Sequence, residues 1–166
     1  MTRNFHPRQA ERGMKISEFL HPDAVIGALA ARDKPGVIAE LCAVLAKRVD
    51  GAAPEKLTEV LLDRERLSST GIGDGVAIPH GKLQGLPALV AAFGVSRDGL
   101  DFDAIDHKPS QLFFALLAPE SSAGVHLKAL ARISRLFKNP AFRKAILDAP
   151  DAKAIYDLIV GEDSKT

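Results

Sequence analysis

Two kinds of apolar pattern alternate along this chain, and the alternation limits its fold more than any other feature. Residues 88–95 and 111–117 are continuous apolar runs, which are typical of strands buried on both faces of a sheet. Elsewhere apolar residues recur at helical spacing, in segments that begin near Asp33, at Pro54 and near Ser122. Strands interleaved with helices predict an α/β protein with the architecture of a three-layer α/β/α sandwich.

The same patterns place the other elements. Asp33 is expected to cap a helix that has Pro35 in its first turn and ends near Val49. The remaining expected elements are a strand at 25–29, a turn-like segment with a short edge strand at 97–109, and helices at 140–147 and 151–160.

The two ends of the chain differ from the segment between them. Residues 1–13 are polar and predict a flexible leader, and residues 162–166 predict a short frayed tail. The total of 166 residues fits the usual size of one domain, which we place at 14–161.

Composition excludes several classes of protein. The chain has 22 Lys and Arg residues against 21 Asp and Glu residues, a formal net charge of +1, so it lacks the positive field typical of proteins that bind nucleic acid or anionic membranes. The single cysteine, Cys42, excludes an internal disulfide and a cysteine-based zinc cluster. With no signal peptide and no apolar run near the ~20 residues of a spanning helix, we predict a cytoplasmic protein without membrane insertion.

A glycine-dense segment at 68–75 is the first candidate for chemistry. Gly71, Gly73 and Gly75 are spaced G-x-G-x-G, and Pro79 would interrupt the helix that a dinucleotide fingerprint requires. Flexible main chain of this kind can direct several N–H groups at one anion. The alternative is an ordinary tight turn.

His80 is the candidate nucleophile. It stands between Pro79 and Gly81, and a neutral imidazole is a good nucleophile near neutral pH because its ordinary pKa is about 6.5. The alternative is a loop histidine that makes a surface hydrogen bond.

Two further residues could assist His80 with an anionic group. Arg64, near the end of the predicted helix from Pro54, could pair with a phosphoryl group, or it could belong to a solvated helix end with local ion pairs. His126 falls on the apolar stripe close to a helix start, where unpaired N–H groups favour anions. A core histidine bonded to a carbonyl is the alternative for His126.

No metal and no cofactor are expected, because the histidines lack the close spacing of local metal motifs and there is no phosphate-binding G-x-x-x-x-G-K-[ST] sequence. The basic stripe of Lys128, Arg132 and Arg135 predicts a solvated helix face; docking of an acidic partner and binding of nucleic acid are the weaker alternatives.

A known family resembles this chain over residues 14–161. The segment 64–82, RERLSSTGIGDGVAIPHGK, resembles the phosphorylation-site signature of enzyme IIA proteins of the phosphoenolpyruvate-dependent phosphotransferase system, in the fructose/mannitol class. The later segments 102–106, FDAID, and 112–119, LFFALLAP, resemble the nitrogen-regulatory branch in particular. The resemblance implies a mixed sheet between helical layers.

The resemblance also implies roles for individual residues. His80 would accept a phosphoryl group, usually on Nε2, from a phosphohistidine of a small HPr-like carrier protein, with Arg64 and His126 around that group. The residues implied to bind the phosphoryl group through hydroxyl or backbone contacts are Ser69, Thr70, Gly71 and Gly73.

Two details of the implied site stay open. Asp74 stands where sugar-specific relatives often carry Glu, which leaves its role undecided. Ile72, Val76 and Ile78 could form an apolar rim at which a partner docks, whereas a role in the strand core is equally consistent for Val76 and Ile78.

The leading functional hypothesis is a protein-histidine phosphotransferase component of a phosphorelay, whose phosphorylation state decides which regulated target proteins it binds. Nitrogen, potassium and carbon metabolism are the processes associated with this branch. The alternative within the family is a sugar-specific enzyme IIA that passes phosphate to a IIB component for fructose or mannitol uptake. A second alternative is a non-catalytic interaction module on the same scaffold.

Overall fold

The computed structural model describes residues 14–165, so the predicted leader at 1–13 lies outside the described residues. In chain order the elements are a 3₁₀ turn η1 (Ile16–Glu18), strand β1 (Leu20–Ile26), helices α2 (Lys34–Ala46) and α3 (Pro54–Leu67), strands β2 (Gly71–Gly73), β3 (Val76–Ala77), β4 (His80–Leu83), β5 (Val90–Leu100) and β6 (Ser110–Pro119), and helices α4 (Ala123–Leu136), α5 (Pro140–Asp148) and α6 (Ala152–Asp163).

The six strands form one mixed sheet. Its order is β1-β5-β6-β3-β2. Strand β3 pairs with the first half of one edge of β6, and β4 pairs with the second half of the same edge. Strands β3 and β4 run parallel to β6, whereas β5 runs antiparallel to it. Because β4 pairs only with β6, the first residue of β4 lies at an edge of the sheet.

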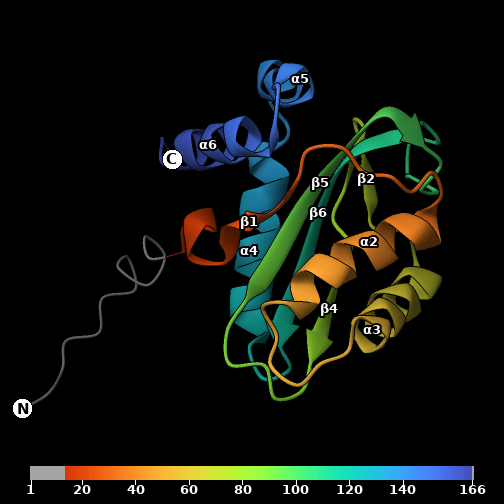
Figure 1. The fold of residues 1–166 in the computed structure, drawn as a ribbon, viewed down its shortest axis with the longest axis vertical. Helices are drawn as coiled ribbons and strands as arrows, with labels where there is room; N and C mark the ends of the chain where they lie inside the picture. Colours follow the sequence, from red (N-terminus) through yellow and green to blue (C-terminus); the bar gives the residue numbers. More distant parts are fainter. Residues whose placement is uncertain (1–13, 166) are drawn as a thin grey trace, which may run out of the picture.

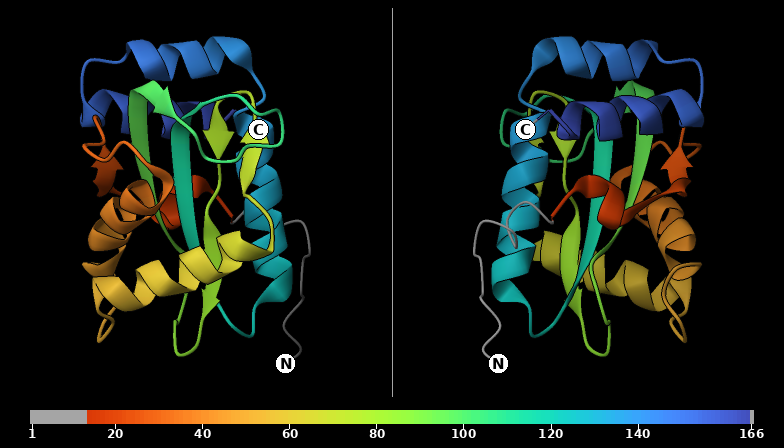
Figure 2. Two further views of the ribbon diagram at one scale, coloured as in Figure 1. Left: turned by 90° about the vertical axis from the view of Figure 1, so that its right-hand side faces the viewer. Right: turned by 90° about the vertical axis from the view of Figure 1, so that its left-hand side faces the viewer.

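Helices cover the sheet on both sides (Figures 1 and 2). Helices α2 and α3 lie on one face, α4 lies on the other, and α5 and α6 lie together near one end of the molecule (Figure 2). Six strands, five α-helices and a single domain confirm the predicted α/β sandwich with a mixed sheet.

The core lies between these layers and is dominated by the two apolar strands. The first half of β5 and nearly all of β6 are buried, as the unbroken apolar runs predict, whereas Arg97 and Asp98 in the second half of β5 are exposed. Phe93 and Phe114 pack edge to face with ring centroids 5.7 Å apart, and Phe137 from the end of α4 stacks on Phe93 at 5.6 Å. Burial of large aromatic rings contributes most per residue to such a core.

Several boundaries differ from the sequence-based expectations where polar residues continue an element. Strand β1 spans Leu20–Ile26 rather than residues 25–29. Its polar first half was missed because one side of this edge strand faces solvent. Strand β5 continues through Leu100, which pairs with Ser110. The first four residues of the predicted turn-like segment at 97–109 therefore belong to β5. Helix α2 ends at Ala46, before Val49.

The C-terminal expectations need two corrections. Helix α6 continues to Asp163, beyond the expected end at residue 160 and into the expected frayed tail at 162–166. Asp163 is buried there, and its carboxylate accepts a hydrogen bond from the backbone N–H of Ile16 at 2.7 Å. Arg132 is not on a solvated face: its Nε donates to the same carboxylate at 2.5 Å, and its side chain is only 16% exposed. The pairing buries both charged groups between α4 and α6.

Candidate functional site

His80 opens strand β4 instead of lying on a loop, because its backbone joins the ladder with β6 opposite Leu116. The ring is half-buried, and its Nδ1 lies 2.6 Å from the carbonyl oxygen of Ile78. A carbonyl can only accept a hydrogen bond, so Nδ1 carries the proton and the lone pair of the neutral ring is on Nε2.

His126 lies beside His80. It is the fourth residue of α4, its side chain is buried, and the centroids of the two imidazole rings are 5.2 Å apart. The Nδ1 atom of His126 is buried and has no hydrogen-bond partner among the described residues. Nδ1 of His126 is therefore not bonded to a carbonyl among the described residues, which disfavours the alternative of a core histidine satisfied in this way.

Both imidazoles are held in the neutral state more strongly than an exposed histidine. Burial lowers the pKa of His80 below its ordinary value of 6.5; the hydrogen bond to Ile78 raises it, the charge of Arg64 lowers it, and the charge of Glu65 raises it. Burial also lowers the pKa of His126, and His80, Lys82 and Arg64 lower it further. A neutral ring keeps the lone pair that a nucleophile needs.

Arg64 supplies positive charge from the last turn of α3. Its guanidinium donates a hydrogen bond to the carbonyl oxygen of Ser68 at 3.0 Å, and its charge acts on the pKa of both histidines. The structure therefore brings Arg64, His80 and His126 into one region. Three elements meet there: the end of α3, the start of β4 and the first turns of α4.

Lys82 is a cation that the sequence reasoning passed over. It lies on β4 two residues after His80, and side chains two apart on a strand share a face. Its charge acts on the His126 ring. Strand alternation could have found it, once His80 was placed on a strand.

The hydroxyl groups of the glycine segment have partners within the protein. Ser69 Oγ donates to the carbonyl oxygen of Phe102 at 2.8 Å and accepts from the N–H of Gly71 at 3.0 Å. The Thr70 hydroxyl donates to the Glu65 carboxylate, and the N–H of Thr70 donates to the same group at 3.1 Å. These bonds shape the turn, and binding of a phosphoryl group by Ser69 and Thr70 stays a prediction.

The glycines and Asp74 serve the geometry of the same turn. A Cβ atom at Gly71 would lie 2.8 Å from the Cα of Ala104, so only glycine permits this approach. Gly73 has a φ of 92°, in the left-handed region that favours glycine. The N–H of Asp74 donates to the Asp106 carboxylate at 3.1 Å. Gly71 and Gly73 as phosphoryl-binding groups stay predictions.

The apolar residues considered for a docking rim divide into two groups. Val76 and Ile78 are buried in the core, whereas Ile72 is exposed. On α4 the two neighbours of His126 in the chain, Val125 and Leu127, are also exposed. Exposed apolar side chains therefore lie on α4, beside His126, as well as on the glycine segment.

Two charged residues near the site carry no signal in the local sequence. Glu65, next to Arg64 on α3, has a carboxylate that is only 3% exposed, and Lys34 from the first turn of α2 pairs with it at 2.8 Å. Residues so far apart in the chain can be recognised as a pair only after folding. Lys34 also lies 4.7 Å from the ring centroid of Phe102.

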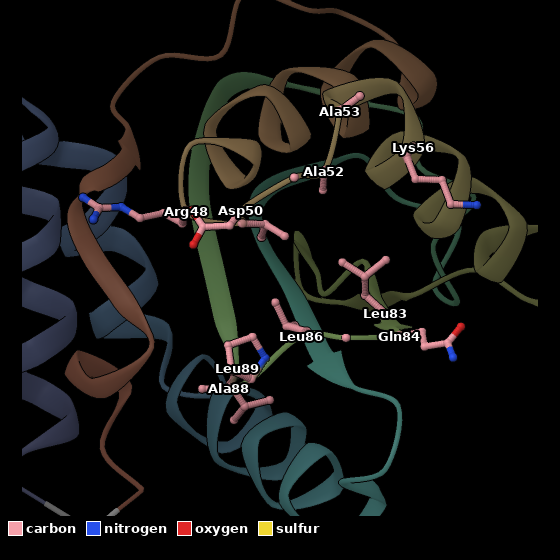
Figure 3. Close-up of a pocket in the computed structure, with 14 residues that line it drawn as sticks. Arg48, Asp50, Ala52, Ala53, Lys56, Leu83, Gln84, Leu86, Ala88 and Leu89 are labelled. Atoms are coloured by element: carbon pink, nitrogen blue, oxygen red, sulfur yellow. The ribbon is translucent and has the colours of Figure 1, made fainter.

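A pocket elsewhere in the molecule is separate from these residues. It has a volume of about 720 Å³ and lies between the α2–α3 and β4–β5 connections, where Figure 3 shows Ala52, Leu83 and Leu86. Its lining includes neither histidine of the site. The two neighbouring rings and the lowered pKa values lie at the histidines and not in this pocket, so the histidines form the candidate site.

Residues 14–165 also bear on metal binding and on membrane insertion. Within 14–165, no group of three or more His, Cys, Asp or Glu side chains is arranged to hold a metal ion. In the same range none of the helices combines the length and the apolar character needed to cross a membrane.

Fold and site together define a class: a mixed α/β/α sandwich that presents a neutral, edge-strand histidine beside a second histidine and an arginine, an arrangement suited to receiving an anionic group. The family described as "Phosphoenolpyruvate-dependent sugar phosphotransferase system, EIIA 2" matches residues 18–161. The chain belongs to this family, whose members are components of a phosphotransferase system.

Known relatives lie in two branches. The chain is 40% identical over 146 residues to a nitrogen regulatory protein of Bradyrhizobium diazoefficiens, covering 88% of this chain and 95% of that protein. It is 38% identical over 150 residues to the fructose-specific EIIABC component of Bacillus subtilis, covering 90% of this chain but 24% of that protein.

A solved structure agrees with the first branch. The nitrogen regulatory protein IIA-Ntr of Neisseria meningitidis superposes with a TM-score of 0.82 at 31% identity, covering 87% of this chain and 98% of that one. The predicted family and its regulatory branch are thus confirmed at the level of similarity.

Proposed function

We propose that this protein is a phosphorelay component in which Nε2 of His80 accepts a phosphoryl group from the phosphohistidine of an HPr-like carrier. The observation that carries the proposal is the 2.6 Å contact between His80 Nδ1 and the Ile78 carbonyl oxygen, which leaves Nε2 as the nucleophilic atom. The lowered pKa of the ring supports it, because the ring stays neutral at neutral pH.

The transfer step balances without a cofactor. The lone pair of Nε2 forms a bond to phosphorus while the N–P bond of the carrier breaks, and the carrier's imidazole keeps the electron pair of the broken bond. The proton on His80 Nδ1 stays in place, bonded to Ile78, and disperses the positive charge that the ring acquires. Such a step depends on positioning and on stabilising the charge of the moving group.

Arg64, Lys82 and His126 are the groups proposed to stabilise that charge. Arg64 and Lys82 are cations whose charges act on the histidine rings, so they lie close enough to attract a phosphoryl group there. The His126 ring, which has an unpartnered Nδ1, can donate to or accept from a group bound beside His80. Ser69, Thr70, Gly71 and Gly73, which shape the adjoining turn, are the further residues proposed to bind the phosphoryl group through hydroxyl or backbone contacts.

The regulatory role is the function that similarity favours. The match with this chain covers 95% of the nitrogen regulatory relative and 98% of the IIA-Ntr chain. We therefore propose that the phosphorylation state of His80 controls the binding of regulated target proteins in the cytoplasm. The fructose-specific relative supports the alternative, in which the phosphoryl group passes to a IIB component.

The test is phosphate uptake. The protein is incubated with phosphoenolpyruvate, the first enzyme of the system and an HPr-like carrier, and its intact mass is measured. We expect one acid-labile phosphoryl group, absent in His80→Ala, retained in the exposed-histidine control His21→Ala, and gained more slowly by Arg64→Ala and His126→Ala. Uptake by His80→Ala would contradict the proposal.

A second arm separates the two branches. After phosphorylation, candidate IIB proteins of the fructose and mannitol type are added and the loss of the phosphoryl group is followed. Retention supports the regulatory role, whereas rapid discharge to a IIB protein would overturn it in favour of the sugar-specific alternative.

A further inference from the structure

A buried carboxylate lies next to the proposed site without touching the group that would be transferred. Glu65 sits on the last turns of α3, and its side chain is 3% exposed. It accepts hydrogen bonds from both the N–H and the hydroxyl of Thr70, and Lys34 pairs with it at 2.8 Å. A buried carboxylate is tolerated only when its oxygens are satisfied in this way.

Continuous hydrogen bonds join this carboxylate to the ring of His80. Thr70, held by Glu65, accepts the N–H of Ile78 through its own carbonyl oxygen at 3.0 Å. The carbonyl oxygen of Ile78 in turn accepts from His80 Nδ1 at 2.6 Å. The path from Glu65 to the imidazole therefore crosses two residues, and each link is a hydrogen bond.

Helix α3 also holds the other end of the segment that carries His80. Gly81, directly after His80, packs so closely on this helix that a Cβ atom there would lie 2.9 Å from Val60 Cγ1. Glu65 contacts the segment at Thr70 and Val60 contacts it at Gly81. The same helix carries Arg64, so a single rigid element sets the positions of Arg64 and His80 relative to one another.

From this arrangement we propose that Glu65, anchored by Lys34, is a positioning residue for phosphoryl transfer, which orients the His80 ring through Thr70 and Ile78. The proposal rests on the function proposed for His80. Glu65 does not contact the reacting atoms; it acts through the hydrogen bonds that determine which ring nitrogen carries the proton.

The chain offers a matched control for the burial of a charge. Asp163 and Arg132 form a second ion pair with the same side-chain exposures, 3% and 16%, as Glu65 and Lys34. It joins α4, α6 and η1, and its hydrogen bonds lead to Ile16 rather than to His80. Asp163→Asn therefore perturbs a buried ion pair without breaking the path to the imidazole.

The experiment compares Glu65→Gln, Thr70→Val, Thr70→Ser and Asp163→Asn in the full chain. For each we measure the maximal rate of phosphate uptake, the carrier concentration that gives half that rate, the tautomer of His80 from ring ¹⁵N shifts, and thermal stability. Thr70→Ser keeps the hydroxyl and serves as the conservative rescue.

We expect Glu65→Gln and Thr70→Val to lower the maximal rate about 10- to 100-fold, the size of effect that small misplacements of reacting groups produce. The half-saturating carrier concentration stays unchanged, the Nδ1–H tautomer of His80 loses population, and Thr70→Ser restores both rate and tautomer. Asp163→Asn lowers stability but leaves rate and tautomer as in the native protein.

Two outcomes would overturn the inference: a Glu65→Gln protein with native rate and tautomer, or a loss of rate in Asp163→Asn equal to that in Glu65→Gln. The tautomer measurement needs no carrier, so it still tests the positioning role if the native protein takes up no phosphate. A native protein that takes up no phosphate would contradict the proposed function, but it would leave the positioning role of Glu65 to be decided by the tautomer.

Discussion

Two buried ion pairs of equal exposure stand in different parts of the molecule. Lys34 and Glu65 lie beside the proposed site, and Arg132 and Asp163 lie where α4 meets α6. Both hold secondary structure elements together, but only the first continues by hydrogen bonds to His80. The difference shows that what a buried charge does depends on where its remaining hydrogen bonds lead.

The largest expected change in the free energy of unfolding follows from removing one partner of each pair. Lys34→Met leaves Glu65 buried without its cation, and Arg132→Met does the same to Asp163, so each should lower the free energy of unfolding by about 3–5 kcal/mol. Urea denaturation measures this. Only Lys34→Met is expected to slow phosphate uptake as well.

An exposed ion pair provides the reference for this prediction. Lys153 and Asp157 pair at 2.8 Å with side chains that are 85% and 60% exposed. Lys153→Met should leave the free energy of unfolding almost unchanged, because solvent screens such exposed pairs. Equal losses in all three variants would remove the distinction between buried and exposed pairs.

Smaller changes in stability are expected from substituting one glycine in each of the same two regions. Gly81→Ala forces a Cβ atom against Val60 and should cost about 1–3 kcal/mol while slowing phosphate uptake. Gly161 on α6 has open space around it, so Gly161→Ala should raise the free energy of unfolding by about 0.4–1 kcal/mol. Denaturation of both variants checks the signs, and stabilisation by Gly81→Ala would refute the close packing of β4 on α3.

The smallest expected effects concern pH. Because the pKa values of His80 and His126 are lowered in the folded protein, the unfolded chain binds more protons between those values and 6.5. The histidine contribution to stability is therefore complete above pH 6.5 and is lost as the pH falls through this window. Denaturation midpoints measured across it should decrease towards acid.

Charge substitutions next to His80 should move its titration in opposite directions. Arg64→Met removes a charge that lowers the pKa of His80 and should raise it, whereas Glu65→Gln removes a charge that raises the pKa and should lower it. NMR titration of the ring measures both. Shifts of the same sign would contradict the placement of these two charges around His80.

Sequence patterns predicted the parts of this molecule that depend on local periodicity. The apolar strands β5 and β6 and the helix opened by Pro54 were found because burial on both faces, or on one helical stripe, leaves a regular pattern. The polar start of β1 was missed because an edge strand need not be apolar throughout.

The site divides in the same way. His80, Arg64 and His126 could be predicted because residue type, neighbours and family resemblance all pointed to them. Lys34 and Glu65 could not, because each looks like an ordinary helix-surface residue in the sequence and only tertiary contact joins them. The burial of Arg132 was missed for the same reason, since its partner Asp163 lies on another helix.

The atom that receives the phosphoryl group gives the most direct test. Protein with ¹⁵N-labelled histidine is phosphorylated by its carrier, and ³¹P–¹⁵N coupling identifies the bonded nitrogen. The hydrogen bond from Nδ1 of His80 to Ile78 predicts a single phosphoryl group on Nε2 of His80. A phosphoryl group on Nδ1, or on any other residue, would contradict the account.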